Sequence, residues 1–187
     1  MAGVPRFVLL DRDGVINQRI VGGYVTSWEN FVFLPGALEG LRLLTTRNYQ
    51  VIVVSNQAGV GKGLMSAEDL AGITGRFVQE VEARGGRIRS VYYCTHRAEE
   101  NCTCRKPRPG LLLKAQAEHH FNFEDTFLIG DSESDLLAAQ AVGCPAIMVS
   151  NAPLASFEKL PHAPRATVPG LLAATDYLLS RMGCYNY

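Results

Sequence analysis

Residues 6 to 15 read RFVLLDRDGV, an apolar run followed at once by two aspartates and a glycine. The run from Phe7 to Leu10 contains no polar residue, which is typical of a strand buried on both faces of a sheet. Asp11 and Asp13 are two positions apart, so both carboxylates can point to the same side of an extended segment. The stretch therefore predicts a buried strand with paired carboxylates at its carboxyl end, where α/β sheets bind ligands.

Four more short apolar runs follow, separated by longer helix-like stretches. The expected strands are 6–10, 50–55, 90–94, 126–130 and 145–149, and the expected helices are 36–48, 66–84, 110–121, 134–142 and 169–182. This alternation predicts a single doubly wound, mostly parallel α/β sheet of the Rossmann-like type, with helices on both faces. Residues 153 to 170 are expected to be a surface connection before the last helix. The whole chain, residues 1 to 187, is expected to form one domain.

Composition indicates a globular protein without a charge bias. Hydrophobic residues make up 47% and charged residues 19%, and 18 basic residues balance 18 acidic ones. No net field is left to attract nucleic acid or anionic lipid. The apolar runs are far shorter than the roughly 18 residues of a membrane span, and the amino terminus lacks a secretory pattern. We expect a cytoplasmic monomer that binds neither nucleic acid nor membrane.

Polar residues follow two further expected strands. Ser55 and Asn56 open the stretch SNQAGVGKG, whose glycines let backbone N–H groups approach an anion. The stretch GDSESD places Asp131 and Asp135 just beyond the fourth expected strand. Asp135 also suits a plain capping role in the first turn of a helix. Because parallel strands end at one edge of the sheet, we expect Asp131 to face Asp11 across a cation.

Four motifs, in this order, resemble those of the haloacid dehalogenase-like phosphatase superfamily. They are DRDGV after the first strand, Ser55 after the second, Lys106 ahead of a helix, and GDSESD after the fourth strand. The motifs span residues 7 to 135, so the resemblance covers most of the chain. It implies a phosphoric monoester hydrolase that works with Mg²⁺ through an aspartyl-phosphate.

The resemblance also implies a role for each motif residue. Asp11 would be the nucleophile, and Asp13 would be the general acid and base. Ser55 and Lys106 would bind and stabilise the phosphoryl oxygens. The implied Mg²⁺ ligands are Asp11, the backbone carbonyl of Asp13, and Asp131, with Asp135 orienting the metal or Lys106.

Residues 94 to 107, CTHRAEENCTCRKP, carry three cysteines and a histidine within eleven residues. A Cys₃His set is a standard tetrahedral structural zinc site, and reactive thiols, a disulfide or chance clustering are the alternatives. Stable disulfides are rare in the cytoplasm, so we expect Zn²⁺. The expected ligands are Cys94, His96, Cys102 and Cys104. Such a site would brace the loop and aim Arg105 and Lys106 at the phosphoryl site. Cys144 and Cys184 are expected to pack as small apolar side chains.

The same loop indicates a subgroup. A zinc-stapled loop ending in CRKP resembles the heptose bisphosphate and histidinol-phosphate phosphatases, which lack a large cap domain. Residues 16 to 34 leave room for only a small flap, in agreement. NQAGVGKG and CRKPRPGLLLKA look more like the D-glycero-D-manno-heptose 1,7-bisphosphate 7-phosphatases. The resemblance implies removal of the 7-phosphate, which supplies heptose for lipopolysaccharide or related glycans.

The resemblance also implies which residues contact the substrate. Arg105 would contact the sugar bisphosphate away from the scissile phosphate, with Tyr24, Asn56 and Gln57 helping to enclose it. Two features depart from the pattern: the zinc loop is compact, as in a histidinol-phosphatase, and Ser132 stands where relatives often carry Lys or Arg. A histidinol-phosphate or other small-molecule phosphatase is the alternative. A zinc-dependent binding module or a polynucleotide-end phosphatase partner is a third interpretation, which the neutral charge disfavours.

Overall fold

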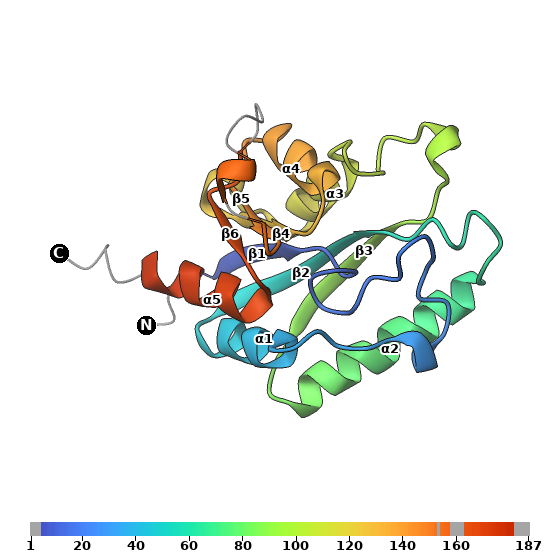
Figure 1. Ribbon diagram of the computed structural model, residues 1–187, viewed down its shortest axis with the longest axis horizontal. Coiled ribbons are helices and arrows are strands. Elements are labelled where there is room, and N and C mark those ends of the chain that lie inside the picture. Colours follow the sequence, from blue (N-terminus) through green and yellow to red (C-terminus); the bar gives the residue numbers. More distant parts are fainter. Residues whose placement is uncertain (1–4, 153, 158–162, 182–187) are drawn as a thin grey trace.

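The computed structural model describes residues 5–152, 154–157 and 163–181, and Figure 1 shows one twisted sheet between two layers of helices. The strands are β1 (Arg6–Leu10), β2 (Tyr49–Asn56), β3 (Ile88–Cys94), β4 (Phe127–Gly130), β5 (Ala146–Val149) and β6 (Ala166–Val168). The α-helices are α1 (Ala37–Thr46), α2 (Ala67–Ala83), α3 (Gly110–His119), α4 (Glu133–Gln140) and α5 (Leu171–Ser180).

The six-stranded sheet has the order β3-β2-β1-β4-β5-β6, and every described pairing between neighbours is parallel. The chain winds outward from β1 to β3 and then returns to start the other half at β4. The neighbours β1 and β4 therefore form the switch point of a doubly wound sheet, where ligands bind beyond the carboxyl ends. This arrangement confirms the predicted α/β fold class.

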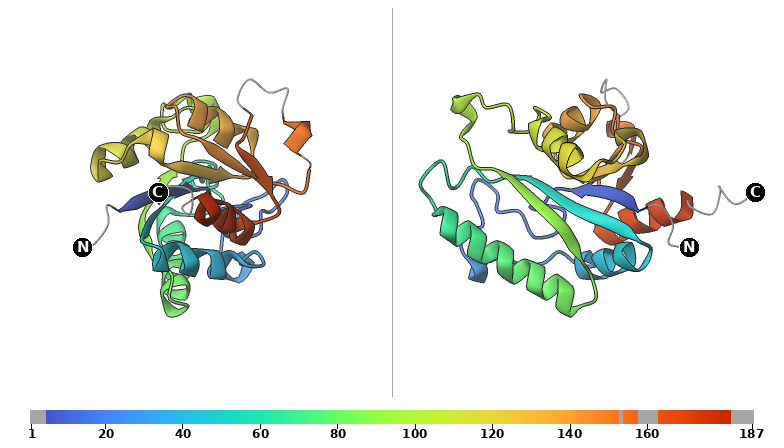
Figure 2. Two further views of the ribbon diagram at one scale, coloured as in Figure 1. Left: turned by 90° about the vertical axis from the view of Figure 1, so that its left-hand side faces the viewer. Right: turned by 180° about the vertical axis from the view of Figure 1, so that it is seen from behind.

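Helices cover both faces of the sheet. Figure 2 shows α1, α2 and α5 on one face, with α3 and α4 on the other. Successive side chains of a strand point to opposite faces. Val8 and Leu10 accordingly belong to the core under α1, α2 and α5, while Leu9 belongs to the core under α3 and α4. The absence of polar residues in the first strand follows from this double burial.

The main error of the sequence prediction lies between residues 153 and 170. We expected a surface connection there, but Ala166–Val168 forms β6, which pairs with β5 at the edge of the sheet. Three residues are too few to show an alternating pattern. A capping box starts α2, with the Asp69 amide donating to Ser66 Oγ at 3.0 Å. Cys184 lies outside the described residues.

The loop from β1 to α1 carries no inserted domain. Within it the structure has one 3-10 turn, Trp28–Asn30, and isolated bridges that join Asn17 to Asp13 and Phe33. The segment agrees with the expectation of a flap and no large cap. None of the described helices combines the length and apolar character that crossing a bilayer requires.

Candidate active site

Asp11 and Lys106 form a buried ion pair at the carboxyl end of β1. Lys106 Nζ lies 3.0 Å from Asp11 Oδ2. The Asp11 amide donates to the Ile129 carbonyl at 2.9 Å, so the contact between β1 and β4 continues to this residue. Burial raises the pKa of Asp11 to about 6, although Lys106 beside it acts in the opposite direction. The predicted nucleophile therefore lies against a cation that favours its ionised form.

Lys106 is a charge fixed on three sides. Besides Asp11, its ammonium contacts the Val54 carbonyl at 2.8 Å and Asp135 Oδ1 at 2.5 Å. Burial alone disfavours the charged form, but Asp11 and Asp135 outweigh it and raise the pKa of Lys106. The Lys106 amide donates to Asn56 Oδ1 at 3.1 Å, and Asn56 Nδ2 donates back to the Lys106 carbonyl at 3.0 Å. The side chain of Asn56 thus holds the peptide of Lys106.

Asp131 and Asp135 bring two more carboxylates to the same place, from the turn after β4 and the first turn of α4. One oxygen atom of each lies within 4.8 Å of the other and of an oxygen of Asp11. Asp135 also accepts from the Ser132 amide at 3.2 Å and its hydroxyl at 2.6 Å, so its capping role and its contact with the site coexist. A Cβ atom on Gly14, whose φ is 88°, would overlap the carboxylate of Asp131. A glycine lets the two loops meet there.

The carboxylate of Asp13 lies outside this cluster and is enclosed by N–H donors. Its Oδ1 accepts from Asn17 Nδ2 at 2.7 Å and from Arg12 Nη2 at 3.0 Å. Its Oδ2 accepts from Gln57 Nε2 at 2.6 Å. The side chain of Asp13 is thereby fixed in orientation, and its contact with a metal through the backbone carbonyl stays a prediction.

Ser55 and Gln57, at the end of β2, connect these two groups. The Ser55 hydroxyl hydrogen-bonds Asp11, which acts to lower the pKa of that carboxyl against the larger effect of burial. Gln57 Nε2 lies 3.2 Å from Ser55 Oγ as well as contacting Asp13. Gln57 is fully buried, and its predicted contact with a substrate stays a prediction.

The donor set of the acidic cluster suits a hard divalent cation. Three carboxylates lie together, two of them against the buried ammonium of Lys106, and the mostly exposed Arg19 reaches Asp131 Oδ2 at 3.1 Å from the flap. Burial, followed by Asp135, raises the pKa of Asp131, as expected where negative charge is in excess. Oxygen ligands are the ones that Mg²⁺ takes in proteins.

The second cluster is formed by the four residues predicted to bind zinc. Cys104 Sγ lies 3.2 Å from Cys94 Sγ and 3.2 Å from His96 Nδ1, and Cys102 Sγ lies 3.5 Å from Cys94 Sγ. A disulfide would need about 2.05 Å, whereas zinc bonds of about 2.3 Å place tetrahedral ligands at roughly these separations. Burial raises the pKa of Cys94 to about 12, so its thiolate form requires a nearby cation. The cluster fits a closed tetrahedral site.

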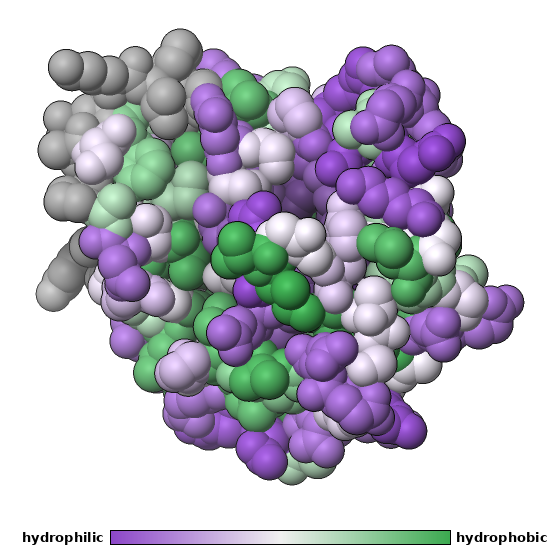
Figure 3. Space-filling view, turned by 45° about the vertical axis from the view of Figure 1, so that its right-hand side comes forward, coloured by the Kyte–Doolittle hydropathy of each residue, from purple (hydrophilic) through white to green (hydrophobic). Residues whose placement is uncertain are grey.

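The flap and the glycine-rich loop meet beside the site. Lys62 Nζ lies 5.3 Å from the ring centroid of Tyr24, and a Cβ atom on Gly59 would come within 3.2 Å of that ring. Two apolar side chains in these loops are exposed, Val21 at 95% and Leu64 at 57%. Figure 3 shows apolar side chains reaching the surface in the middle of this face, with hydrophilic ones around them. Tyr24 therefore lies where the flap meets the glycine-rich loop, a place that we call the rim.

Arg105 and Ser132 differ in whether their polar side-chain atoms have hydrogen-bond partners. The Nη1 atom of Arg105 is buried, and among the described residues it has no hydrogen-bond partner. The hydroxyl of Ser132, in contrast, contacts Asp135 and lies 2.9 Å from Ser134 Oγ. Arg105 thus keeps one donor unused among the described residues, whereas Ser132 serves the start of α4.

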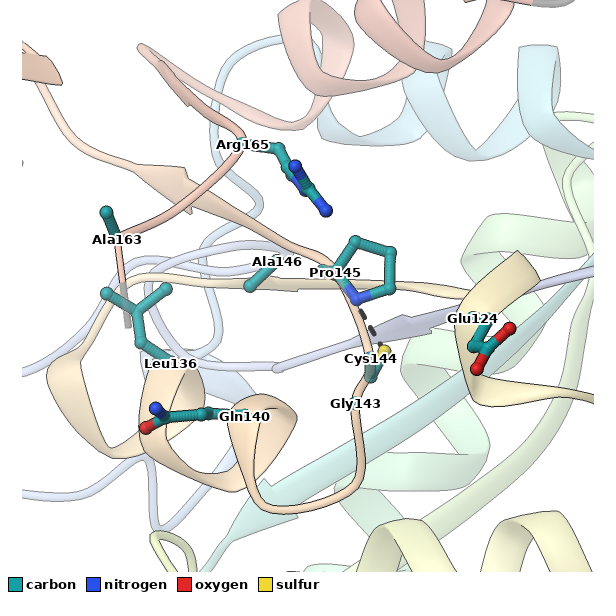
Figure 4. A pocket seen from close by; sticks show the side chains of 9 residues that line it. All are labelled: Glu124, Leu136, Gln140, Gly143, Cys144, Pro145, Ala146, Ala163 and Arg165. Atoms are coloured by element: carbon teal, nitrogen blue, oxygen red, sulfur yellow. Dashed lines mark hydrogen bonds between the residues drawn. The ribbon is translucent and has the colours of Figure 1, made fainter. Parts of the chain in front are cut away.

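A cavity of about 300 Å³ lies away from these clusters, before β5 (Figure 4). Glu124, Gln140 and Arg165 are among its lining residues, and Cys144 donates to the Pro145 carbonyl at its wall. None of the predicted site residues lines it. Cys144 is buried in an apolar core cluster, as expected.

Three residues of the site were not singled out from the sequence: Arg12, Asn17 and Arg19. Arg12 lies within the DRDG motif and Asn17 three residues after it, but only the turn from Gly14 to Asn17 brings their side chains to Asp13. The only hint in the sequence was the position of Arg12 between Asp11 and Asp13, whose side chains are expected to point to the same side of the segment. Arg19 meets Asp131 across 112 positions, which no local pattern predicts.

Comparison with known proteins gives the class first. The family model "Hydrolase_like", described as HAD-hydrolase-like, matches residues 103–174. One solved structure that matches is the D,D-heptose 1,7-bisphosphate phosphatase from B. bronchiseptica, complexed with magnesium and phosphate. The match has a TM-score of 0.87 and 30% sequence identity, and it covers 94% of this chain and 99% of that one. The fold is that of a haloacid dehalogenase-like hydrolase.

Sequence relatives narrow the class to a family. A Helicobacter pylori protein named D-glycero-beta-D-manno-heptose-1,7-bisphosphate 7-phosphatase is 41% identical over 140 residues, which are 74% of this chain and 79% of that protein. A Mycobacterium tuberculosis protein named D-glycero-alpha-D-manno-heptose-1,7-bisphosphate 7-phosphatase is 40% identical over 157 residues, covering 81% and 83%. The chain belongs to the family of the heptose-1,7-bisphosphate 7-phosphatases, and it is a phosphatase.

Proposed function

We propose that this chain removes the 7-phosphate of D-glycero-D-manno-heptose 1,7-bisphosphate through an aspartyl-phosphate on Asp11. One observation carries the proposal. In a chain about 40% identical to phosphatases of that name, Asp11 Oδ2 lies 3.0 Å from the buried ammonium of Lys106 at the switch point of the sheet. An ionised carboxylate beside a fixed cation is suited to attack a phosphoryl group that the same cation attracts.

In the first step, an oxygen of the Asp11 carboxylate attacks phosphorus, and the bond from phosphorus to the sugar oxygen breaks. The sugar oxygen keeps that electron pair and takes a proton from Asp13. Ser55 and Lys106 bind the phosphoryl oxygens, and their contacts with Asp11 support this placement. Proton transfer at this point helps most when the leaving oxygen is a poor leaving group, as a sugar alkoxide is.

In the second step, a water oxygen attacks phosphorus and the bond between phosphorus and Asp11 breaks. The electron pair returns to the Asp11 carboxylate, and Asp13 takes the proton from water. The side chain that gave the first proton is thereby ready to receive the second. The contact of Gln57 with both Asp13 and Ser55 supports a location of Asp13 beside the phosphoryl group.

We assign Mg²⁺ to the acidic cluster, held by Asp11, the backbone carbonyl of Asp13, and Asp131. When bound, Mg²⁺ would offset negative charge on the transferring phosphoryl group. Asp135 orients Lys106, with which it shares the 2.5 Å contact. We assign Zn²⁺ to Cys94, His96, Cys102 and Cys104, where it braces the loop that ends at Arg105.

We propose that Arg105 binds the second phosphate of the substrate, the one that is not removed. Its buried Nη1 donor has no partner among the described residues, as a group reserved for a ligand would. The rim formed by Tyr24 and the backbone near Gln57 would enclose the sugar. The two relatives carry names that differ in the anomer, so the proposal covers both anomers. A single domain over residues 1 to 187, a monomer and a cytoplasmic location remain part of the proposal.

Replacement of Asp11 tests the chemistry. We expect Asp11→Asn to abolish Mg²⁺-dependent phosphate release, with an unchanged circular dichroism spectrum, because the amide cannot act as the nucleophile. Glu39→Gln, which alters a surface carboxylate paired with Arg42, is the control and should keep full activity. Turnover by Asp11→Asn at the wild-type rate would exclude the nucleophile assignment.

A further inference from the structure

Arg12 is a fully buried arginine next to the proposed site. Its side chain is 0% exposed, which is unusual for this residue type unless it is paired. The guanidinium carbon lies 5.8 Å from the ring centroid of Phe31 and 5.7 Å from that of Tyr93. Burying a charge costs free energy that good pairing must offset. A long cationic side chain in this place therefore indicates a role tied to its partner.

The partner is the carboxylate of Asp13. Arg12 donates to Asp13 Oδ1 from Nε at 3.3 Å and from Nη2 at 3.0 Å, and Nη2 also lies 3.1 Å from Oδ2. The same Nη2 donates to Gln57 Oε1 at 3.0 Å, while Gln57 Nε2 donates to Asp13 Oδ2. Arg12, Gln57 and Asp13 thus form a closed triangle of hydrogen bonds. A planar guanidinium gives this contact a direction that a point charge would lack.

The two oxygens of Asp13 are not equivalent. Oδ1 is occupied by Arg12 and by Asn17 at 2.7 Å. Oδ2 lies on the side of Gln57, whose amide nitrogen reaches Ser55 Oγ at 3.2 Å. Oδ2 contacts two nitrogen donors, Gln57 Nε2 and Arg12 Nη2, against three for Oδ1, so it is the less fully occupied oxygen and lies on the side of the phosphoryl site.

We propose that Arg12 is a positioning residue, which fixes the Asp13 carboxylate so that Oδ2 gives and takes the proton in both steps. The inference rests on the proposed function, in which Asp13 carries that proton. Without Arg12, only Asn17 and Gln57 hold the carboxylate, so its orientation is less well defined and proton transfer loses part of its geometry. Loss of orientation should therefore affect proton transfer and leave phosphoryl binding largely intact.

The test compares a sugar phosphate with an aryl phosphate such as p-nitrophenyl phosphate, whose leaving group departs without a proton. For Arg12→Met we expect kcat/KM for the sugar phosphate to fall roughly a hundredfold, while kcat/KM for the aryl phosphate changes little. Asp13→Asn should show the same split. Arg12→Met should also give a burst of p-nitrophenol with the aryl phosphate. The first step stays fast, but hydrolysis of the aspartyl-phosphate needs Asp13 as a base, and Asp13 is no longer held in place.

Matched variants separate positioning from folding. Arg12→Lys keeps the charge and loses the planar fork, and we expect it to restore part of the activity toward the sugar phosphate. Arg42→Met, at an exposed arginine on α1, should match wild type with both substrates. If Arg12→Met does not fold, Arg12→Lys and Gln57→Leu replace it in the test. In both variants kcat/KM should fall more for the sugar phosphate than for the aryl phosphate, by a smaller factor than for Arg12→Met.

An equal loss with both substrates, no loss, or a gain with the sugar phosphate would overturn the inference. Failure of the proposed function looks different: wild type would hydrolyse neither substrate, or Asp11→Asn would remain active. The two ideas can therefore fail separately.

Discussion

At the scale of single residues, the site depends on close approaches that few side chains permit. Gly14 lies against the carboxylate of Asp131, and Gly130 lies against the side chain of Asp135. Lys106 then contacts Asp135 and Asp11 together. A methyl group at either glycine would displace an acidic side chain before it disturbed the core.

Gly14→Ala is expected to leave the protein folded and to reduce kcat roughly a hundredfold, because a shift of about 1 Å in a positioned group has that order of effect. The added Cβ would overlap Asp131, and the φ of 88° is strained for alanine. Steady-state kinetics and a thermal melt measure the two effects.

The control for this substitution is Gly75→Ala in α2, where an added Cβ meets nothing within 4 Å. It should stabilise the protein by roughly 0.5–1 kcal/mol through helix propensity. Full activity in Gly14→Ala would contradict the close contact between the two loops.

At the scale of elements, the carboxyl ends of β1, β2 and β4 carry the acidic cluster and Ser55, and the loop after β3 carries the zinc set and Lys106. The last zinc ligand, Cys104, directly precedes Arg105 and Lys106, which the zinc site is expected to orient toward the phosphoryl site. The loop from Thr95 to Pro109 contains only one 3-10 turn, Ala98–Glu100. A metal is the natural brace for a segment with so little regular structure.

Cys104→Ser is expected to remove the zinc, lower the melting temperature and reduce activity with the sugar phosphate. Elemental analysis should find about one zinc per chain in wild type and much less in the variant. Cys144→Ala is the control, since that thiol lies in the core and outside the cluster. A Cys104→Ser protein that is metal-free yet fully active would show that zinc binding and phosphatase activity are independent.

His119, at the end of α3, provides a pH test of the contact between α3 and the edge strand β3. Burial, followed by Arg89, lowers the pKa of His119, with Glu118 opposing and His120 adding to the effect. Its neutral ring nitrogen Nε2 lies 3.0 Å from Ser90 Oγ and 3.1 Å from Tyr92 Oη. A lowered pKa means that the folded state favours the neutral form.

The stability contributed by neutral His119 is therefore present above the unfolded pKa of about 6.5 and is lost as the pH falls below it. Melting temperatures between pH 8 and pH 5 should fall more steeply for wild type than for His119→Gln. Parallel curves for the two proteins would contradict the assignment.

At the scale of the whole molecule, much of the fold could be predicted because its strands are buried on both faces and show plain apolar runs. The three-residue β6 could not, since so short an edge strand shows no pattern. The predicted metal ligands and Lys106 follow strands at fixed positions, so the sequence alone indicated them. Arg12 and Arg19 did not stand out, because their roles depend on turns that bring them to Asp13 and Asp131.

The absence of an inserted domain within the loop from β1 to α1 leaves substrate choice to short loops around the site. Arg105, with its unpartnered donor, and the rim at Tyr24 would then decide which phosphate ester fits. A bisphosphate offers a second anion to Arg105, whereas a monophosphate does not.

The substrate assignment is tested by comparing kcat/KM for both anomers of heptose 1,7-bisphosphate with kcat/KM for histidinol phosphate. We expect one or both anomers to exceed histidinol phosphate by several orders of magnitude, with phosphate released from the 7-position. Arg105→Met should remove most of that preference. A higher kcat/KM for histidinol phosphate would contradict the assignment of a heptose bisphosphate substrate.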